Sequence, residues 1–387
     1  MKKKIILLNI SKSTAEIDWI LPVLYRLRYK YKIFTLFQNL QSYKSLERDK
    51  TLFYLWKKIS YGYAIDNIYN KLIRFFSKKI FNKINLKNYF LNKGINLLEV
   101  NILLSEFGTY SWIIEEIKKQ KIKLISIHFP TSSFIFGIEK KNIKIKYKLN
   151  GDLLFLCNKL DIDFWKKRIE KNKIKIVGVP KYDPEWLKRI NKKKIIKKKK
   201  VILIAYSSRF NLPNTNYKLL EDQLFNIMTV LKNFKNYKII FKIHPRKNNS
   251  HYLKILNKFK EVDWEISKEN LLRLTKCCDL FLHDKNSSVI YEGLIMKKPC
   301  IEYWNLDEDK NTLHAQDYLK LNVLAKNPKK LDYLIRLAIS DPKNQIWKKQ
   351  YKNFISNLQK FMHGSSKYTS EYIVKIVKMF TIMLIYI

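Results

Sequence analysis

The sequence predicts an α/β protein in which two doubly wound, Rossmann-like domains face each other across a cleft. Short apolar runs typical of buried strands alternate with apolar-periodic stretches typical of helices along most of the 387 residues. The run KKKIIKKKK at 192–200 interrupts this alternation, and so dense a block of charge favours an exposed boundary. We therefore expect a first domain over 1–190, a second over 200–342, and carboxyl-terminal helices over 343–387.

The first half of the chain contains six runs with the length and apolar content of buried strands. They lie at 5–10, 31–37, 100–104, 123–127, 153–157 and 173–177. Ser13 and Glu16 have the spacing of a capping box, which predicts a helix from there to about residue 30. The segment 41–95 carries aromatic residues at helical intervals and is predicted to be mostly helical.

The alternation starts again after the lysine-rich boundary. Strands are expected at 201–205, 237–243, 279–283 and 299–303, and helices near 216–233, 250–260, 268–277 and 287–297. Because strands and helices alternate, the sheet of each domain is expected to be parallel.

The composition favours anionic partners. The net charge is +44, from 77 Lys and Arg against 33 Asp and Glu, which suits nucleic acid, anionic lipid or phosphorylated substrates. However, the chain is rich in residues read from AT-rich codons, so most lysines are expected to form a solvated surface. The hydrophobic content of 47% predicts a folded protein.

Cysteine and glycine usage excludes several classes of protein. The four cysteines contain no C-x-x-C pair, which favours a reduced, cytoplasmic protein. The eight glycines are too far apart for G-x-G-x-x-G or for a phosphate loop, so a dinucleotide dehydrogenase and a P-loop NTPase are excluded. No run of about 18 uninterrupted apolar residues predicts a membrane span.

Two polar motifs follow predicted strands of the second domain. His244 and Arg246, with a proline between them, come after one strand, and Ser287 and Ser288 come after another. Parallel sheets bind ligands where strands end, so these four residues are expected to hold the phosphates of a ligand. His244 is also a candidate catalytic residue, since its imidazole could act as an acid. Glu292 falls one turn further on, within reach of ribose hydroxyls. Each residue also has a simpler explanation: a histidine bonded to a loop carbonyl, serines that cap a helix, and a surface glutamate.

These motifs carry a resemblance. The His-Pro turn, the Ser-Ser turn and the E-G-L-x-x-x-K-P stretch at 292–299 resemble the nucleotide-binding half of GT-B enzymes that build bacterial surface polysaccharides. Similar families are the CDP-glycerol glycerophosphotransferases and the bacterial sialyl- and polysialyltransferases. The sequence GVPKYD at 178–183 resembles the turn that precedes the second domain in such enzymes. The resemblance covers roughly 174–303.

The resemblance implies a GT-B fold and a transferase. A sugar or polyol phosphate would pass from a nucleotide-activated donor, CMP- or CDP-linked, to a surface glycan or a lipid-linked acceptor. The donor is a substrate, and neither a cofactor nor a metal is implied. Asp161 and Asp163 have the D-x-D spacing of metal sites in other glycosyltransferases, but they begin a helix-like stretch and are interpreted as caps.

The resemblance also implies that the first domain supplies a catalytic base. The candidates are Glu106, in the sequence SEFG, and His128, in the sequence IHFP. The His128 turn is similar in place to the His-Gly turn of the glycerophosphotransferases, although Phe129 stands where glycine is expected. The turn at Glu106 loosely resembles the acidic-acidic-Gly motif of polysialyltransferases. Either side chain could instead be a polar group satisfied in a loop.

Other functions remain open from the sequence alone. A nucleotide-sugar epimerase shares the fold and a His-Pro turn, and the net charge also suits a non-catalytic protein that binds membranes or nucleic acid. No zinc finger or RNA-recognition signature is present, so no specific nucleic acid partner is expected. The stretch YIVKIVKMFTIMLIYI at 372–387 carries its two lysines on one helical face. It is expected either to lie on the inner face of an anionic membrane or to pack across the two domains.

Overall fold

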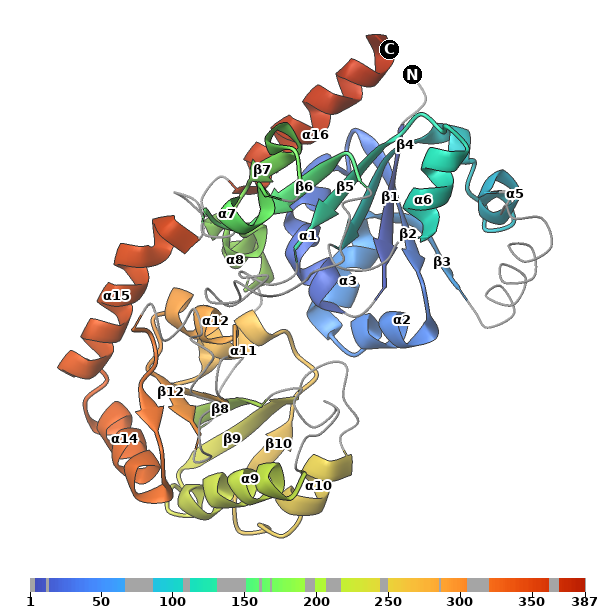
Figure 1. Cartoon of the computed structure of the whole chain (residues 1–387). Helices are drawn as coiled ribbons and strands as arrows, with labels where there is room; N and C mark the ends of the chain where they lie inside the picture. The colour runs from blue at the N-terminus through green and yellow to red at the C-terminus, as the bar shows by residue number, and fades with distance from the viewer. Residues whose placement is uncertain are drawn as a thin grey trace. The chain divides into compact units, whose positions relative to one another are not determined.

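The chain folds into two compact α/β units. The computed structural model describes residues 4–11, 14–66, 86–106, 112–130, 151–159, 162–167, 169–191, 199–206, 217–243, 250–284, 287–304, 320–361 and 369–386. Unit 1 comprises residues 1–136, 141–186 and 359–387, and unit 2 comprises residues 137–140 and 187–358. Each unit holds one all-parallel sheet flanked by helices, which confirms the predicted α/β fold (Figure 1).

The sheet of unit 1 has seven strands in the order β3-β2-β1-β4-β5-β6-β7. The strands are β1 (Lys4–Ile10), β2 (Tyr31–Phe37), β3 (Ser60–Ile65), β4 (Val100–Glu106), β5 (Ile125–Phe129), β6 (Leu153–Leu156) and β7 (Ile174–Ile176). The winding of the chain reverses between β1 and β4. In such sheets, the crevice outside the carboxyl ends of the two strands at the reversal is the usual ligand site.

Helices lie on both faces of this sheet. They are α1 (Thr14–Leu27), α2 (Leu40–Glu47), α3 (Lys50–Ile59), α5 (Leu86–Leu91), α6 (Trp112–Lys119), α7 (Ile162–Trp165) and α16 (Thr369–Tyr386), with single 3-10 turns at η1 (Leu97–Glu99), η2 (Lys171–Lys173) and η3 (Pro180–Tyr182). Helix α8 (Pro184–Ile190) begins in unit 1 and ends in unit 2. Near the start of α1, a Glu16 carboxylate oxygen accepts a hydrogen bond from the Ser11 backbone N–H at 2.9 Å. The predicted capping partner, Ser13, lies outside the described residues.

The sheet of unit 2 has six parallel strands in the order β10-β9-β8-β11-β12-β13. The strands are β8 (Lys200–Tyr206), β9 (Tyr237–Ile243), β10 (Trp264–Ile266), β11 (Leu280–Asp284), β12 (Cys300–Tyr303) and β13 (Leu324–Ala325). The helices are α9 (Tyr217–Leu231), α10 (Ser250–Leu256), α11 (Leu271–Cys277), α12 (Ile290–Ile295), α14 (Pro328–Ser340) and α15 (Gln345–Phe361). Here the winding reverses between β8 and β11.

The helical prediction for 41–95 is wrong over strand β3. Tyr61 and Tyr63 lie on one face of this strand and are 61% and 40% exposed, which is the alternation of an edge strand. Gly62 lies between them, where a Cβ atom would stand 2.9 Å from the Phe34 ring of β2. Close approach to β2 therefore explains why a weakly apolar segment pairs as a strand. The short strands β10 and β13 were also not predicted.

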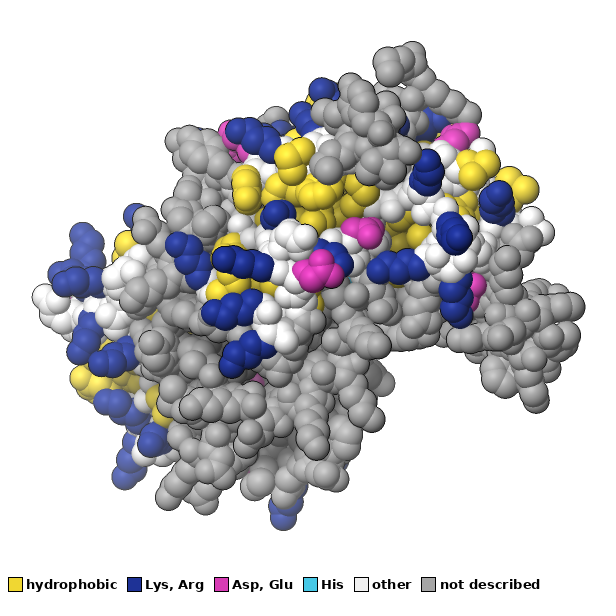
Figure 2. Space-filling model, turned by 45° about the horizontal axis from the view of Figure 1, so that its top comes forward, with side chains coloured by type: hydrophobic (Ala, Val, Ile, Leu, Met, Phe, Trp, Pro, Cys, Tyr) yellow, Lys and Arg dark blue, Asp and Glu magenta, His cyan; other side chains and the backbone are white. Residues whose placement is uncertain are grey.

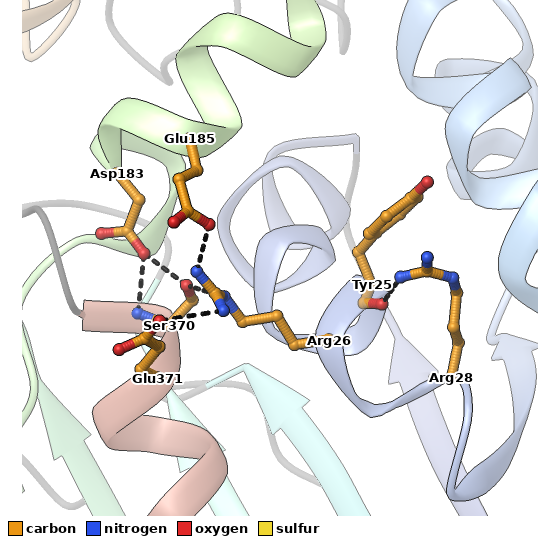
Figure 3. A network of polar contacts seen from close by, with 7 residues as sticks. All are labelled: Tyr25, Arg26, Arg28, Asp183, Glu185, Ser370 and Glu371. Atoms are coloured by element: carbon orange, nitrogen blue, oxygen red, sulfur yellow. Dashed lines mark hydrogen bonds and ion pairs between the residues drawn. The ribbon is translucent and has the colours of Figure 1, made fainter.

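Helix α16 is tied to unit 1 through the turn at 178–183 (Figure 3). An Asp183 carboxylate oxygen accepts hydrogen bonds from the backbone N–H of Ser370, at 2.8 Å, and from its hydroxyl. Arg26 of α1 donates to the same hydroxyl at 2.8 Å and forms ion pairs with Glu185 at 2.6 Å and Glu371 at 3.1 Å. Asp183 thus caps the first turn of α16 and holds it beside α1.

The Asp183 cap gives a stability prediction with a definite pH dependence. Burial raises the pKa of Asp183 to about 6, against the effect of its hydrogen bonds from Ser370. The folded state therefore binds the proton more tightly than the unfolded state, and this group's contribution to the free energy of unfolding decreases as pH rises from about 4 to about 6. Asp183→Asn keeps an oxygen acceptor without the charge, whereas Asp183→Ala loses both bonds and should cost about 1–2 kcal/mol.

Urea unfolding of the three proteins at pH 5 and pH 8 tests this prediction. The wild type should gain stability relative to Asp183→Asn when the pH is lowered from 8 to 5. An equal difference at both pH values would show that the carboxyl does not titrate with a raised pKa.

The rest of α16 packs on α1 along one face. Ile373, Val374, Ile376 and Val377 are buried, and the Tyr31 hydroxyl of β2 donates to Thr381 Oγ1 at 3.1 Å. Among the described residues, no helix combines the length and the apolar character that crossing a bilayer requires.

Candidate functional site

The carboxyl edge of the unit 2 sheet gathers the polar groups predicted for the second domain. Strands β8 and β11, between which the winding reverses, end at Tyr206 and Asp284, and β9 ends at Ile243. His244 and Arg246 follow β9 in the sequence, but they lie outside the described residues. The described half of the predicted donor site therefore consists of β11 and the turn into α12.

Ser287 and Ser288 form this turn. The backbone N–H groups of Ile290 and Tyr291 donate to the carbonyls of Ser287 and Ser288 at 3.3 and 3.2 Å, so the chain turns helically from Ser287 onward. The N-cap residue of α12 is Val289, which makes no side-chain capping bond. Among the described residues, neither serine hydroxyl makes a hydrogen bond, and Ser288 is exposed. Helix capping therefore does not explain the two serines.

Glu292 and Gly293 occupy the first turn of α12. Glu292 is only 4% exposed, and its charge helps burial raise the pKa of the Cys300 thiol on β12, so the carboxylate lies close to the sheet. A Cβ atom on Gly293 would stand 2.3 Å from Cys300 Sγ and 2.7 Å from Phe281 Cδ1. The absence of a side chain at Gly293 thus lets α12 approach β11 and β12, and this approach positions Glu292. The simpler explanation of Glu292 as a surface glutamate is therefore wrong, because the side chain is buried.

Two polar residues at the end of β11, His283 and Asp284, were not among the site residues predicted from the sequence. His283 is 1% exposed, and its Nδ1 lies 2.9 Å from the Asp284 carbonyl oxygen. Burial lowers the pKa of His283 to about 4, so the imidazole is neutral at pH 7. In register, His283 lies between Ala205 of β8 and Glu302 of β12. The sequence signal for this pair was a polar His-Asp end on an apolar strand.

In unit 1, Glu106 and His128 lie on neighbouring strands. Glu106 is the last residue of β4, and His128 is the penultimate residue of β5 and pairs in register with Ser105. Both side chains are 5% exposed. Burial lowers the pKa of His128 to about 4, and a hydrogen bond with the backbone of Glu106 opposes this shift. Both predicted base candidates thus lie at the carboxyl edge of neighbouring strands, but Glu106 pairs with Phe129, so the two side chains project from opposite faces of the sheet.

Buried polar groups continue this row across the sheet. Asn9 of β1 pairs in register with Ser105, and its amide donates to the Ser105 hydroxyl at 3.1 Å. Gln38 in turn donates to Asn9 Oδ1 at 3.0 Å. Since Ser105 pairs with His128, polar side chains extend from β2 to β5 near the carboxyl edge, across the point where the winding reverses.

Gly151 makes room for the imidazole of His128. A Cβ atom at Gly151 would lie 2.6 Å from His128 Cδ2. The ring is therefore held against backbone on one side and tied to the Glu106 backbone, which fixes its orientation.

The D-x-D pair falls on residues whose side chains the structure does not describe. Asp161 lies outside the described residues, and Asp163 falls in α7, where its side chain is not described. Within the described ranges, no three His, Cys, Asp or Glu side chains are grouped to hold a metal ion.

Two parallel, doubly wound sheets with polar side chains at their carboxyl edges define the GT-B class of fold. The family described as CDP-glycerol:poly(glycerophosphate) glycerophosphotransferase matches residues 109–378, more than half of the chain. The chain therefore belongs to this family, which confirms the resemblance predicted from the sequence. The matched range includes His128, the turn at 178–183 and Ser287 to Glu292, whereas Glu106 lies just before it.

Solved structures share the fold across nearly the whole chain. A UDP-GlcNAc 2-epimerase from Neisseria meningitidis bound to UDP-GlcNAc has a TM-score of 0.63 at 12% identity, covering 97% of this chain and 100% of the other. A variant of the wall teichoic acid polymerase TagF has a TM-score of 0.60 at 13% identity, covering 100% and 90%. The epimerase from Methanocaldococcus jannaschii reaches 0.59 at 18% identity, covering 97% and 99%. At these identities the likeness shows the fold alone.

One curated protein also matches. The DNA-directed RNA polymerase subunit beta of Carsonella ruddii is 27% identical over 239 residues, which cover 58% of this chain and 17% of that protein. The chain thus spans about a sixth of the length of this relative. A lysine-rich chain aligns with others of similar composition, and this identity does not show a family.

Proposed function

We propose that the chain transfers a polyol phosphate or a sugar from a nucleotide-activated donor, CDP- or CMP-linked, to a surface polysaccharide or a lipid-linked acceptor. The observation that carries the proposal is the family match over 109–378, together with the Ser-Ser turn and buried Glu292 at the carboxyl edge of the unit 2 sheet. Among the described residues, the charged side chains on the face drawn in Figure 2 are mostly Lys and Arg, which suits phosphorylated substrates.

The residues divide into donor-binding and acceptor-side groups. His244, Arg246, Ser287 and Ser288 would hold the donor phosphates, and Glu292 would accept hydrogen bonds from the ribose hydroxyls. Because α12 has only six residues, the hydroxyls and backbone N–H groups of the Ser-Ser turn would contribute more than the helix dipole. No metal is assigned to the reaction.

His128 is the preferred base for the acceptor hydroxyl. It lies within the family match, and it is neutral at pH 7, so it can accept a proton. The backbone of Glu106 would orient its ring.

The proposal is tested by donor binding and by product analysis. Thermal shifts with CMP, CDP, UDP and GDP identify the base of the donor, and CDP is expected to stabilise the protein most. Incubation with CDP-glycerol and a poly(glycerol phosphate) primer should lengthen the primer. Conversion of a nucleotide sugar without any acceptor would instead identify an epimerase, and no shift with any nucleotide would contradict both enzymes.

The double variant Ser287→Ala/Ser288→Ala should bind CDP about tenfold more weakly, which corresponds to the loss of about one charge-assisted hydrogen bond. Affinity for cytidine should stay unchanged, since it lacks the phosphates. The melting temperature should also hold, because neither serine caps α12. Calorimetry with CDP and with cytidine measures the two affinities. An equal loss of affinity for both ligands would contradict phosphate binding by these serines.

Attachment to the inner face of the membrane is proposed through the outer face of α16. Lys375 and Met379 are exposed, while the opposite face of the helix packs on α1. Removing the helix would uncover α1, so the suitable test is co-sedimentation with anionic vesicles of wild type and Lys375→Glu/Met379→Glu. Equal sedimentation would show that α16 is not the contact.

A further inference from the structure

Five aromatic side chains of β2, α2, α3 and β3 form one connected group, here called the aromatic cluster: Phe37, Tyr43, Phe53, Trp56 and Tyr63. Phe37 and Trp56 are buried and form its base. Tyr43 and Tyr63 stack above them, with ring centroids 5.4 Å apart and planes 10° apart. The cluster is therefore a rigid platform rather than a set of independent surface rings.

The outer rings of this platform reach solvent. Tyr63 is 40% exposed, and Tyr61 on the same face of β3 is 61% exposed. Adjacent exposed aromatic rings on an otherwise folded surface are typical of a binding site.

The cluster lies on the face of the sheet that carries Glu106, whereas His128 projects from the other face at the same carboxyl edge. Phe37 ends β2 and pairs in register with Ile10 of β1, while Asn9 pairs with Ser105, so Phe37 and Glu106 occupy one row. Strand β3, which carries Tyr63, stands three strands from β4 in the sheet order. At about 4.8 Å per strand, the platform is roughly 14 Å from the end of β4. A polymer of a few units could span this distance.

One basic side chain, Lys57, lies against the rings of the cluster. Lys57 Nζ lies 4.9 Å from the Tyr63 ring centroid, 5.4 Å from that of Phe53 and 5.6 Å from that of Trp56. Helices α2 and α3 with the turn between them carry more basic than acidic residues: Lys44, Arg48, Lys50, Lys57 and Lys58 against Glu47 and Asp49. The Asp49 carboxylate is used as the N-cap of α3. The surface thus combines aromatic faces with positive charge.

We propose that the aromatic cluster is a subsite for the anionic acceptor that the family description gives, a poly(glycerophosphate) or a glycosylated form of it. Sugar rings would stack on Tyr43 and Tyr63, and phosphate groups would pair with Lys57 and its basic neighbours. The inference rests on the proposed transferase function and names the part of the first unit that would hold the acceptor. The cluster also lies before residue 109, outside the family match, as suits a feature that selects the acceptor of this particular chain.

Equilibrium binding of a fluorescent, glycosylated poly(glycerol phosphate) to the full chain tests the proposal. Tyr63→Ala and Lys57→Gln should each weaken binding about tenfold, whereas Tyr63→Phe should keep most of the affinity. The matched control is Tyr333→Ala in unit 2, because Tyr333 is 51% exposed and carries Lys330 Nζ 4.5 Å above its ring. The control should bind as the wild type does.

Two outcomes would overturn the proposal. Unchanged glycan binding in Tyr63→Ala and Lys57→Gln, at unchanged melting temperature, would show that the cluster is not a subsite. Equal loss of binding to single-stranded DNA would make it a nucleic acid surface instead. The CDP thermal shift reports separately on the proposed function. If CDP does not raise the melting temperature of the wild type, the proposed transferase function is contradicted, whatever the glycan-binding result.

Discussion

Replacing His128 with glutamine is expected to slow transfer by about 10²–10⁴-fold, the usual contribution of a general base. Glutamine fills a similar space but cannot accept the proton. The melting temperature should change little, since the amide can replace the hydrogen bond to the Glu106 backbone. The matched control is Glu106→Gln, which alters only a side chain and leaves that backbone contact in place, so it should keep most of the activity.

The pH profile gives a second readout for His128. Burial lowers the pKa of this imidazole to about 4, so its neutral, active form persists from pH 8 down to about pH 5. Activity should then be lost as the pH falls through about 4, and no limb from this group should occur near 6.5. An inactive Glu106→Gln beside an active His128→Gln would assign the base to Glu106 instead.

Gly293→Ala is expected to lower the free energy of unfolding by about 1–3 kcal/mol through overpacking. The added methyl group would meet Cys300 Sγ and the Phe281 ring, both fully buried, so α12 has to move away from the sheet. Such a movement displaces Glu292 and the Ser-Ser turn, and CDP affinity should fall together with stability.

The variant Gly293→Ala/Cys300→Ala separates this clash from a general effect on the helix. Removing Sγ relieves the shorter of the two contacts and should recover part of both stability and CDP affinity. Urea unfolding and calorimetry measure the two recoveries. Strictly additive losses in the double variant would show that the two residues do not clash.

The central strands could be predicted from the sequence because they are apolar and bounded by polar residues. Strands β1, β2, β9 and β12 lie within one residue of their predicted bounds. Strand β3 could not be predicted, because its stability depends on pairing with β2 and on the close approach at Gly62 rather than on its own apolar content. Short strands such as β13, with two residues, have the same dependence on their neighbours.

Placement of the site residues could be predicted in part. Parallel winding puts Glu106 and His128 on adjacent strand ends, and the polar turn after β11 identified Ser287 and Ser288. The contact of the His128 ring with the Glu106 backbone, and the space that Gly151 leaves, depend on tertiary packing that no local pattern encodes. The bond between Asp183 and Ser370 joins residues 187 positions apart, so the sequence could give only the turn and not its partner.

The return of α16 to unit 1 sets an order of events during synthesis. All of residues 187–358 leave the ribosome before Ser370, so unit 2 can fold while unit 1 still lacks a helix. Until Ser370 is made, the face of α1 that contacts α16 stays uncovered, and Arg26 and Asp183 lack their shared hydrogen-bond partner. The nascent chain thus holds an unfinished first unit while residues 187–358 are made, and chaperones that bind apolar helices can act in that interval.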